Sequence, residues 1–256
     1  MVLEEGKLMR SVVLVPARYG SSRYPGKPLV SLLGKPMILW VAELSSSAVG
    51  RENVYVATED ERIGAVVRDA GFQAVMTSDN ALTGTDRLAE AAEQIEADIY
   101  INVQGDEPLA NPEDILRVRD EKLKHPDDII NGFSWVSDSE DPHSVNIPKV
   151  ITNERNELVY MSRFALPGYK DKKNAPKQYK KQVCIYAFTK EELIAFKNFG
   201  RKSELEHSED IEILRFLDLN KKIRMIETAP GSLAVDVPSD VDAVENALRS
   251  KFESAL

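Results

Sequence analysis

The chain has 256 residues, 43% of them hydrophobic, and its 33 basic against 42 acidic side chains give a net charge of −9. This composition is typical of a soluble globular protein, and the acidic balance argues against a general nucleic-acid binder, which normally carries a basic surface. The length allows one or two domains, or one large α/β domain. No apolar run approaches the ~18 residues of a membrane span, and residues 1–10 lack a secretory signal pattern, so we expect no membrane partner.

A single cysteine, Cys184, excludes an intrachain disulfide and a Cys-rich zinc site. One free thiol fits a reducing compartment, and we therefore expect a cytoplasmic protein. Cys184 lies within the apolar run VCIYAF, where a small buried residue is the expected role. The sequence also lacks a GxSxG motif, so covalent catalysis has no obvious nucleophile.

The first half of the chain alternates between short apolar runs and helical patterns. The runs predict strands buried on both faces, at residues 11–16, 53–57, 73–76 and 98–103. Helices are predicted between them, at residues 36–47, 60–70 and 85–95. This alternation is typical of βαβ units, and it predicts an α/β fold with a mostly parallel, Rossmann-like sheet covered by helices.

The second half is less regular. Strands are predicted at residues 129–136, 149–151, 157–161 and 182–188, and residues 170–181, with six lysines, predict a polar loop. Helices at 190–198 and 205–219, strands at 222–227 and 233–236, and a final helix after Pro238 follow. We interpret residues 1–256 as a single domain with a smaller β-rich insertion at about residues 130–190.

The segment PARYGSSRYPGKP, residues 16–28, directly follows the first predicted strand. Ligands of open α/β sheets bind beyond the carboxyl ends of the strands, which places this loop at the site. Small residues such as Gly20 and Ser22 allow close backbone approach, and Arg18 and Lys27 add positive charge, which together suit a triphosphate. The spacing is not that of a Walker A loop, and the same residues also suit a basic surface turn.

Two acidic segments follow other predicted strands of the sheet. NVQGDEP, residues 102–108, places Asp106 at the same edge as the first loop, and VDVPSD, residues 235–240, places Asp236 after a short apolar run. If both strands lie in the core sheet, the two carboxylates can converge and hold Mg²⁺, which takes one or two protein carboxylates beside nucleotide phosphates. The alternatives are that Gly-Asp-Glu-Pro is only a turn and that Asp236 only enters a helix.

A fourth segment, MTSDNALTGTDR, residues 76–87, joins a predicted strand to a helix. Its hydroxyls and amides, with Arg87, could recognise the edge of a base. Thr85 or Asp86 could instead serve only as the N-cap of the helix.

Taken in this order, these segments resemble the CMP-KDO synthetases, the 3-deoxy-manno-octulosonate cytidylyltransferases, from about residue 11 to residue 244. YMSRFALP (160–167), CIYAF (184–188) and LEHSEDIEILR (205–215) add to the resemblance. It implies a Mg²⁺-dependent transferase that joins CTP to a KDO-type sugar acid for lipopolysaccharide biosynthesis, and that pairs through the insertion as a homodimer.

The resemblance also implies roles for individual residues. The triphosphate would lie on the first loop, and Lys27 would neutralise charge on the α-phosphate during transfer, while Mg²⁺ would bind Asp106 and Asp236. The residues for the triphosphate would be Arg18, Gly20, Ser22 and Lys27, and those for cytosine and ribose Ser78, Arg87 and Gln104. The sugar-acid pocket would contain Arg163, near the sugar's carboxylate, with Gln182, Tyr186, Glu206 and Glu212.

The sugar side departs from the family pattern. Gln182 replaces a usual histidine, Cys184 replaces a glycine, and residues 167–181 are shorter and rich in lysine. A related substrate, 8-amino-3,8-dideoxy-manno-octulosonate, is therefore an alternative. Two further alternatives are a non-catalytic nucleotide-binding module and a sugar-1-phosphate nucleotidyltransferase. The first could lose the metal carboxylates, and the second has a first loop richer in glycine.

Overall fold

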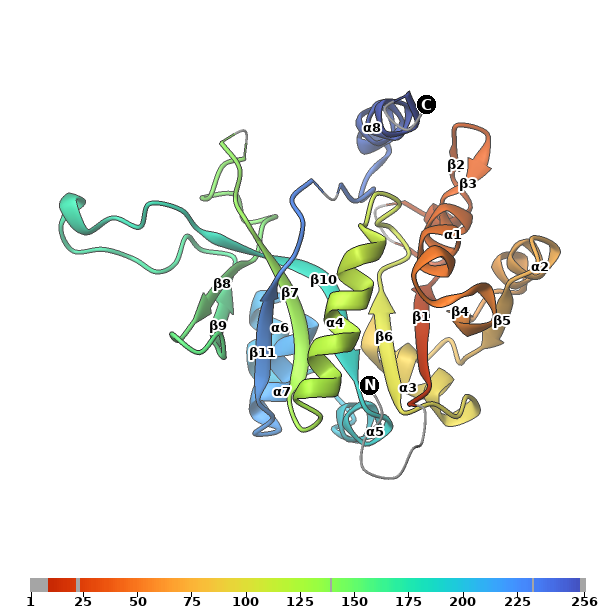
Figure 1. The fold of residues 1–256 in the computed structure, drawn as a ribbon, viewed down its shortest axis with the longest axis horizontal. Helices are drawn as coiled ribbons and strands as arrows, with labels where there is room; N and C mark the ends of the chain where they lie inside the picture. Colours follow the sequence, from red (N-terminus) through yellow and green to blue (C-terminus); the bar gives the residue numbers. More distant parts are fainter. Residues whose placement is uncertain (1–8, 22–23, 139, 232, 254–256) are drawn as a thin grey trace.

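A computed structural model describes residues 9–253 except 22–23, 139 and 232. In this part of the chain, nine strands form one mixed sheet, in which seven strands follow the order β11-β7-β10-β6-β1-β4-β5 and the other two, β8 and β9, branch from β10 (Figure 1). Four of the six neighbouring pairs along that order are parallel and the two pairs made by β10 are antiparallel. The predicted mostly parallel α/β sheet is confirmed.

The first four predicted strands form the parallel half of this sheet. They are β1 (Ser11–Ala17), β4 (Val54–Thr58), β5 (Gln73–Met76) and β6 (Ile99–Val103). The helices that connect them are α1 (Met37–Val49), α2 (Glu61–Asp69) and α3 (Gly84–Gln94). Because β4 and β6 flank β1 on opposite sides, the carboxyl ends of β1 and β6 meet where the strand order reverses, which is where such sheets bind ligands.

The second half of the chain extends the sheet and adds a hairpin. β7 (Ile129–Trp135), β10 (Lys180–Phe188) and β11 (Ile223–Glu227) join the main sheet, while β8 (Lys149–Thr152) and β9 (Leu158–Ser162) pair at the beginning of β10. Figure 1 shows the chain between β9 and β10 extending away from the body of the molecule. The β-rich part thus shares β7 and β10 with the core sheet.

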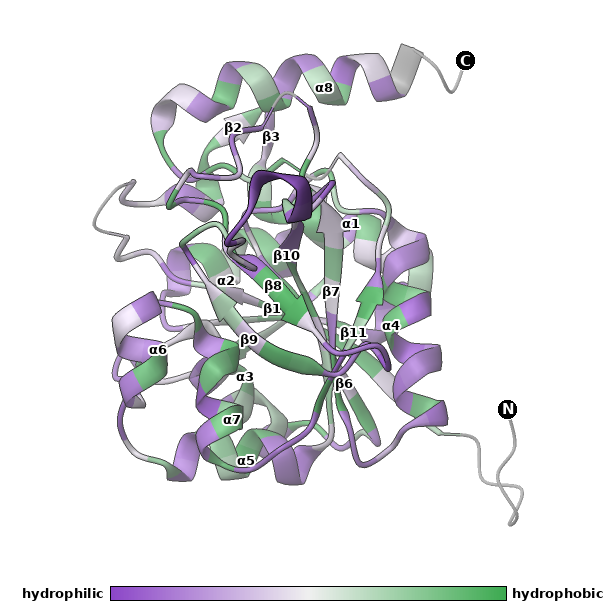
Figure 2. Cartoon of the chain, turned by 90° about the vertical axis from the view of Figure 1, so that its left-hand side faces the viewer, coloured by the Kyte–Doolittle hydropathy of each residue, from purple (hydrophilic) through white to green (hydrophobic). Residues whose placement is uncertain are grey.

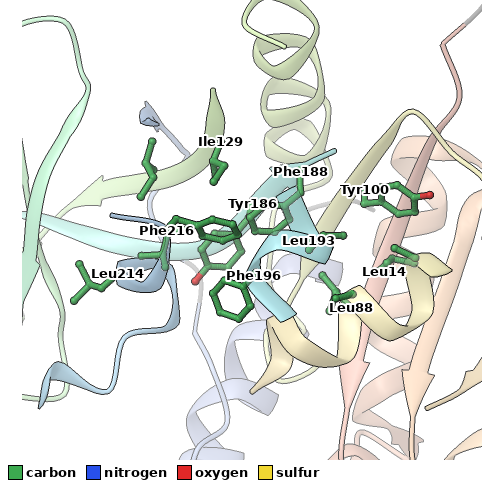
Figure 3. Close-up of a cluster of buried hydrophobic side chains, with 14 of the residues drawn as sticks. Leu14, Leu88, Tyr100, Ile129, Tyr186, Phe188, Leu193, Phe196, Leu214 and Phe216 are labelled. Carbon is green, nitrogen blue, oxygen red and sulfur yellow. The ribbon is translucent and has the colours of Figure 1, made fainter. Parts of the chain in front are cut away.

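Apolar side chains cover both faces of the sheet. On one face, α1, α2 and α4 (Pro112–Lys124) pack on alternate strand residues. On the other face, α3, α5 (Lys190–Asn198) and α7 (Arg215–Asp218) pack around a row of rings (Figure 3). In that row the ring centroids of Tyr186 and Phe188 lie 5.8 Å apart, those of Phe188 and Phe216 5.4 Å, and those of Phe216 and Phe196 4.8 Å. Such pairs add stability beyond their buried area.

Helix α4 was not predicted from the apolar pattern. Its inner face holds Ile115 and Val118, but the next inward position is Lys122, which is 1% exposed and bonded to Glu192. A lysine at a core position breaks the apolar period. The terminal signals are nevertheless present, because the Asn111 side chain caps the first turn and Pro112 occupies the first helical position.

Two other predictions are wrong. Residues 205–219 do not form one helix, because α6 (Glu204–Glu209) ends at Asp210 in the left-handed conformation, and a 3₁₀ turn at Glu212–Leu214 precedes α7. Residues 233–236 form no strand among the described residues, since Val235 makes a single ladder-like bond, from its N–H to the carbonyl of Asp106 at 3.0 Å.

The last helix, α8 (Val241–Glu253), follows a 3₁₀ turn at Pro238–Asp240. Figure 2 shows it lying across one end of the molecule, next to the small hairpin of β2 (Ser31–Leu32) and β3 (Lys35–Pro36). Its apolar side packs on that hairpin through Val244 and Leu248. No helix in the described part of the chain has the length and apolar character needed to cross a membrane.

Candidate active site

A polar cavity of about 330 Å³ lies at the carboxyl ends of β1 and β6. Segments that are far apart in sequence line it: the first loop, the beginning of α3, residues 104–106 after β6, residues around α6, and Asp236. The first three are the segments that the edge rule of open α/β sheets selects from the sequence. Arg18, Lys27, Arg87 and Gln104 all belong to its wall.

Lys27 lies between the two acidic side chains. Its Nζ is 2.5 Å from Oδ2 of Asp106 and 3.5 Å from Oδ1 of Asp236. The backbone bond from Val235 to Asp106 holds residue 236 in place, and the Asp240 carboxylate accepts the N–H groups of Asp236 and Val237 at 2.8 and 2.9 Å. The two carboxylates thus converge on one cation, although Asp236 is in a loop rather than at the end of a strand.

This arrangement fits a magnesium ion. The Asp106 and Asp236 carboxylates face the same ammonium, and carboxylate oxygens are the protein ligands that Mg²⁺ prefers. Among the described residues, no group of three or more His, Cys, Asp or Glu side chains gathers as a metal cage. Asp106 and Asp236 therefore suit an ion that keeps waters and takes its other ligands from substrate phosphates.

Arg87 is buried at the side of the cavity. Its guanidinium contacts Oε2 of Glu59 at 3.1 Å, Oγ1 of Thr77 at 2.5 Å and the carbonyl of Ser78 at 3.1 Å. Burial lowers the pKa of Arg87 from its ordinary 12.5, and the charge of Glu59 opposes this shift. Thr77 and Ser78 thus fix the guanidinium, which belongs to the cavity wall and can hydrogen-bond to a base or a ribose.

Glu59 was not selected from the sequence, although it directly follows β4 at the same edge. Its Oε1 accepts the backbone N–H of Tyr19 at 2.8 Å, and its other oxygen contacts Arg87. Glu59 therefore ties the first loop to the arginine. The rule that selected the other loops, ligand sites beyond the carboxyl ends of strands, could have found it.

Glu212 lies against the N-terminus of α3. Its carboxylate accepts the N–H of Gly84 at 3.2 Å, the N–H of Thr85 at 2.8 Å and the Thr85 hydroxyl at 2.7 Å, and it lines the cavity. The positive end of a helix favours such a carboxylate. The N-cap of α3 is Thr83, whose hydroxyl accepts the N–H of Asp86, rather than Thr85 or Asp86 itself.

Gly105 lets β1 and β6 end side by side. A Cβ atom at Gly105 would lie 2.8 Å from the carbonyl oxygen of Pro16 and 3.3 Å from Cδ1 of Ile38. We expect Gly105→Ala to lower the free energy of unfolding by about 1–3 kcal/mol, because backbone has to shift to admit the methyl group. Urea unfolding measures this. Gly168→Ala, where nothing lies within 4 Å, is the control, and equal stability of the two variants would contradict the steric argument.

Gln182 and Tyr186 lie beside the site within β10, but not in the cavity wall. The β-bulge between Val183 and Tyr186 places them together, so that Nε2 of Gln182 is 3.1 Å from the Tyr186 hydroxyl. The Asn131 side chain donates to the carbonyls of Val183 and Ile185 at 2.9 Å each.

Burial raises the pKa of the Cys184 thiol and of the Tyr186 phenol, so both stay protonated at neutral pH.

Arg163 and Glu206, both predicted for the sugar pocket, lie outside the wall of this cavity. Arg163 donates to the backbone carbonyls of Glu209, Val145 and Asp210 at 2.5, 2.8 and 2.9 Å. Glu206 is 1% exposed, caps α6 and bonds to Arg215 at 2.6 and 2.7 Å. Both side chains stabilise the conformation of the chain around α6.

The remaining predicted residues lie as follows. Ser22 is outside the described residues. Gly20 faces open space in the first loop, and a Cβ there would meet nothing within 4 Å. Ser78 bonds to Glu90 through its N–H and hydroxyl at 2.7 Å, while its carbonyl accepts from Arg87.

Two further residues of the cavity wall, Lys202 and Asp210, were missed. Their side chains pair at 3.0 Å. Lys202 precedes the Ser203 N-cap of α6 in a polar stretch that carries no motif, so the sequence gives no signal for it.

The family model described as cytidylyltransferase matches residues 12–223. A 3-deoxy-manno-octulosonate cytidylyltransferase of Geobacter metallireducens is 39% identical, and the match covers 96% of this chain and all of the relative. An 8-amino-3,8-dideoxy-manno-octulosonate cytidylyltransferase of Shewanella baltica is 40% identical over 94% of this chain and 99% of the relative.

Solved structures agree with this. A CMP:2-keto-3-deoxy-manno-octonic acid synthetase complexed with CTP is 35% identical, with a TM-score of 0.87. The match covers 94% of this chain and 99% of the other. An inositol-1-phosphate CTP transferase from T. maritima, 18% identical with a TM-score of 0.63 over 93% of this chain and 94% of the other, shares the fold. The chain therefore belongs to the cytidylyltransferase family, in the group that contains the 3-deoxy-manno-octulosonate enzymes and their 8-amino relatives.

Proposed function

We propose that this protein transfers a cytidylyl group from CTP to 3-deoxy-manno-octulosonate, giving the CMP-sugar and pyrophosphate. The observation that carries the proposal is the convergence of Asp106 and Asp236 on Lys27 in a cavity that also contains Arg18, Arg87 and Gln104. A nucleoside triphosphate is bound by cationic side chains and by backbone N–H groups that approach it closely, and the wall of this cavity contains cations and the first loop. The product would serve lipopolysaccharide biosynthesis in the cytoplasm.

In the proposed reaction the anomeric hydroxyl of the sugar attacks the α-phosphorus of CTP in line. Arg18 and the first loop hold the phosphates, and Arg87 and Gln104 orient the nucleoside, so that positioning supplies much of the rate. Lys27 neutralises charge that develops on the α-phosphate and pyrophosphate. Asp106 and Asp236 would hold Mg²⁺, which supplies Lewis-acid polarisation of the phosphate and lowers the pKa of a bound hydroxyl.

The 8-amino sugar acid is the second candidate substrate. The relative named for it is 40% identical to this chain and the relative named for the parent sugar is 39% identical, so similarity does not separate them. Gln182, which replaces the family's usual histidine, is in β10, where its amide bonds to the Tyr186 hydroxyl. A neutral amide can bond to a hydroxyl or to an amine.

A substrate panel tests the proposal. Pyrophosphate release is measured with CTP, UTP or GTP, each with 3-deoxy-manno-octulosonate, its 8-amino analogue or a sugar 1-phosphate, in the presence of Mg²⁺. Turnover with CTP and one of the two octulosonates supports the proposal, and the larger kcat/KM identifies the sugar. Turnover only with a sugar 1-phosphate, or none with any pair, would reject it.

We also propose that the protein forms a homodimer through its β-rich part. Large apolar side chains there are exposed: Val145 to 57%, Val159 to 57% and Phe164 to 74%. Exposed apolar groups that gather in one region often mark an interface. We expect light scattering to give twice the chain mass of 28.6 kDa, and Phe164→Glu to shift the mass toward the monomer. A monomeric wild-type protein at micromolar concentration would contradict this.

A further inference from the structure

Four cations belong to the described wall of the cavity: Arg18, Lys27, Arg87 and Lys202. Three of them lie on the nucleotide side. Lys27 bridges Asp106 and Asp236, Arg87 is buried against Glu59, and Arg18 directly follows β1. Lys202 comes from a different segment of the chain, directly before the N-cap of α6.

An octulosonate brings a carboxylate into this cavity. A carboxylate taken out of water needs a charged or hydrogen-bonding partner, because desolvating it alone costs several kcal/mol. Arg163, the partner that the sequence suggested, uses its guanidinium on three backbone carbonyls and is not part of the cavity wall.

We propose that Lys202 binds the carboxylate of the sugar acid, exchanging Asp210 for the substrate; this assignment rests on the proposed function. The side chains of Lys202 and Asp210 are 34% and 75% exposed, so water screens their ion pair and weakens it. The flexible stem of a lysine lets its ammonium turn from one carboxylate to another.

The backbone of Asp210 is held in place. It ends α6 in the left-handed region, at φ 50° and ψ 49°, and its carbonyl accepts a bond from Arg163 at 2.9 Å. Arg163 thus fixes the residue that shares Lys202, and acts on the sugar side as a positioning residue. The free protein keeps the ammonium of Lys202 beside the cavity through Asp210, ready for a substrate anion.

The first test is Lys202→Gln, assayed by pyrophosphate release. We expect the KM for the preferred octulosonate to rise 10- to 100-fold, while the KM for CTP and the kcat at saturation change less than about threefold. Lys197→Gln, which removes a surface lysine paired with Glu93, is the matched control and should leave all three constants unchanged. An unchanged KM for the sugar acid, or a rise only in the KM for CTP, would overturn the assignment.

Asp210→Asn gives a prediction of opposite sign. Asn tolerates the left-handed conformation and keeps the backbone contacts, but it releases the ammonium. We expect the KM for the octulosonate to fall by up to several-fold. A rise of tenfold or more would show that Asp210 itself binds the substrate and would overturn the exchange.

A substrate analogue separates charge recognition from shape. The probe is the 1-carboxamide of the octulosonate, used as a competitive inhibitor against the acid. We expect the wild-type protein to prefer the acid and Lys202→Gln to lose that preference. If Arg163→Met loses the preference for the acid over the carboxamide while Lys202→Gln keeps it, the sugar's carboxylate binds to Arg163 and the proposal fails.

The two proposals fail in different ways. If the wild-type protein releases no pyrophosphate with CTP and either octulosonate, the proposed function fails and the carboxylate assignment fails with it. If the wild-type protein is active and Lys202→Gln behaves like Lys197→Gln, only the assignment of Lys202 fails.

Discussion

Replacing Asp106 by Asn should lower kcat by at least 10²–10³-fold, the loss that follows removal of one electrostatic contact in an active site. Asn has nearly the same shape, but it carries no charge to hold Mg²⁺ or to balance Lys27, whose Nζ lies 2.5 Å from the carboxylate. The fold should persist, because the bond that holds residue 235 goes to the backbone carbonyl of Asp106 and not to its side chain. Pyrophosphate release and thermal unfolding measure the two effects.

Asp120→Asn is the control for charge removal. Asp120 is on α4, its side chain is 51% exposed, and it pairs with Arg119 at 2.7 Å on the surface. This variant should keep wild-type turnover. If Asp106→Asn keeps a near wild-type rate in saturating Mg²⁺, the assignment of Asp106 to catalysis is wrong.

Lys122→Met should be the most destabilising of the substitutions considered, at about 3–5 kcal/mol of unfolding free energy. The Lys122 ammonium is 2.8 Å from both carboxylate oxygens of Glu192 and 2.7 Å from the carbonyl of Asp128, and the two side chains are 1% and 5% exposed. Methionine fills the space of the stem but leaves the Glu192 charge buried without its partner. Urea unfolding at neutral pH measures the loss.

The pH dependence of this loss has a definite sign. Burial raises the pKa of Glu192 above its ordinary 4.5 already in the wild-type protein, and removing the lysine raises it further. As the pH rises above the ordinary pKa of 4.5, the unfolded chain loses the proton of Glu192 while the folded variant still keeps it. The stability of the variant therefore falls as pH rises from 4.5 to the raised pKa of the folded state. We expect a smaller deficit against wild type at pH 5 than at pH 8.

Two variants complete the test of the buried pair. Lys122→Met/Glu192→Leu should recover most of the stability, since it removes both charges and leaves an apolar contact. Lys124→Met, at a lysine that is 60% exposed on the same helix, should change stability by less than about 0.5 kcal/mol. A Lys122→Met protein as stable as Lys124→Met would show that the pair contributes nothing.

The sequence predicts the first half of the fold well, because local and global signals agree there. The runs that became β1, β4 and β6 are buried on both faces, as predicted, and the helices between the strands have a clear apolar side. The prediction of a fully buried strand is wrong for β5, which lies at the edge of the sheet with Gln73 and Met76 exposed. The order of these strands then places the loops after β1, β4 and β6 at one edge. Arg18, Lys27 and Asp106 follow from that edge, whereas Gln104 was selected through the family resemblance.

The rest depends on tertiary contacts that no local pattern encodes. Helix α4 places Lys122 where an apolar residue is expected, and its ammonium is satisfied there by Glu192 on α5 and by the carbonyl of Asp128. Asp210 stops α6 in a conformation that its sequence does not require. Lys202 reaches the cavity because the chain turns there before α6, which is not visible in its neighbours.

The backbone bond between Val235 and Asp106 has a consequence for how the protein is made. Synthesis proceeds from the amino terminus, and domains fold as their residues emerge. Residue 236 comes 130 positions after residue 106, so the loop after β6 leaves the ribosome well before the carboxylate that shares Lys27 with it. Under the proposed function, we therefore expect a chain that ends before residue 236 to lack turnover, because Lys27 then contacts only one of its two carboxylates.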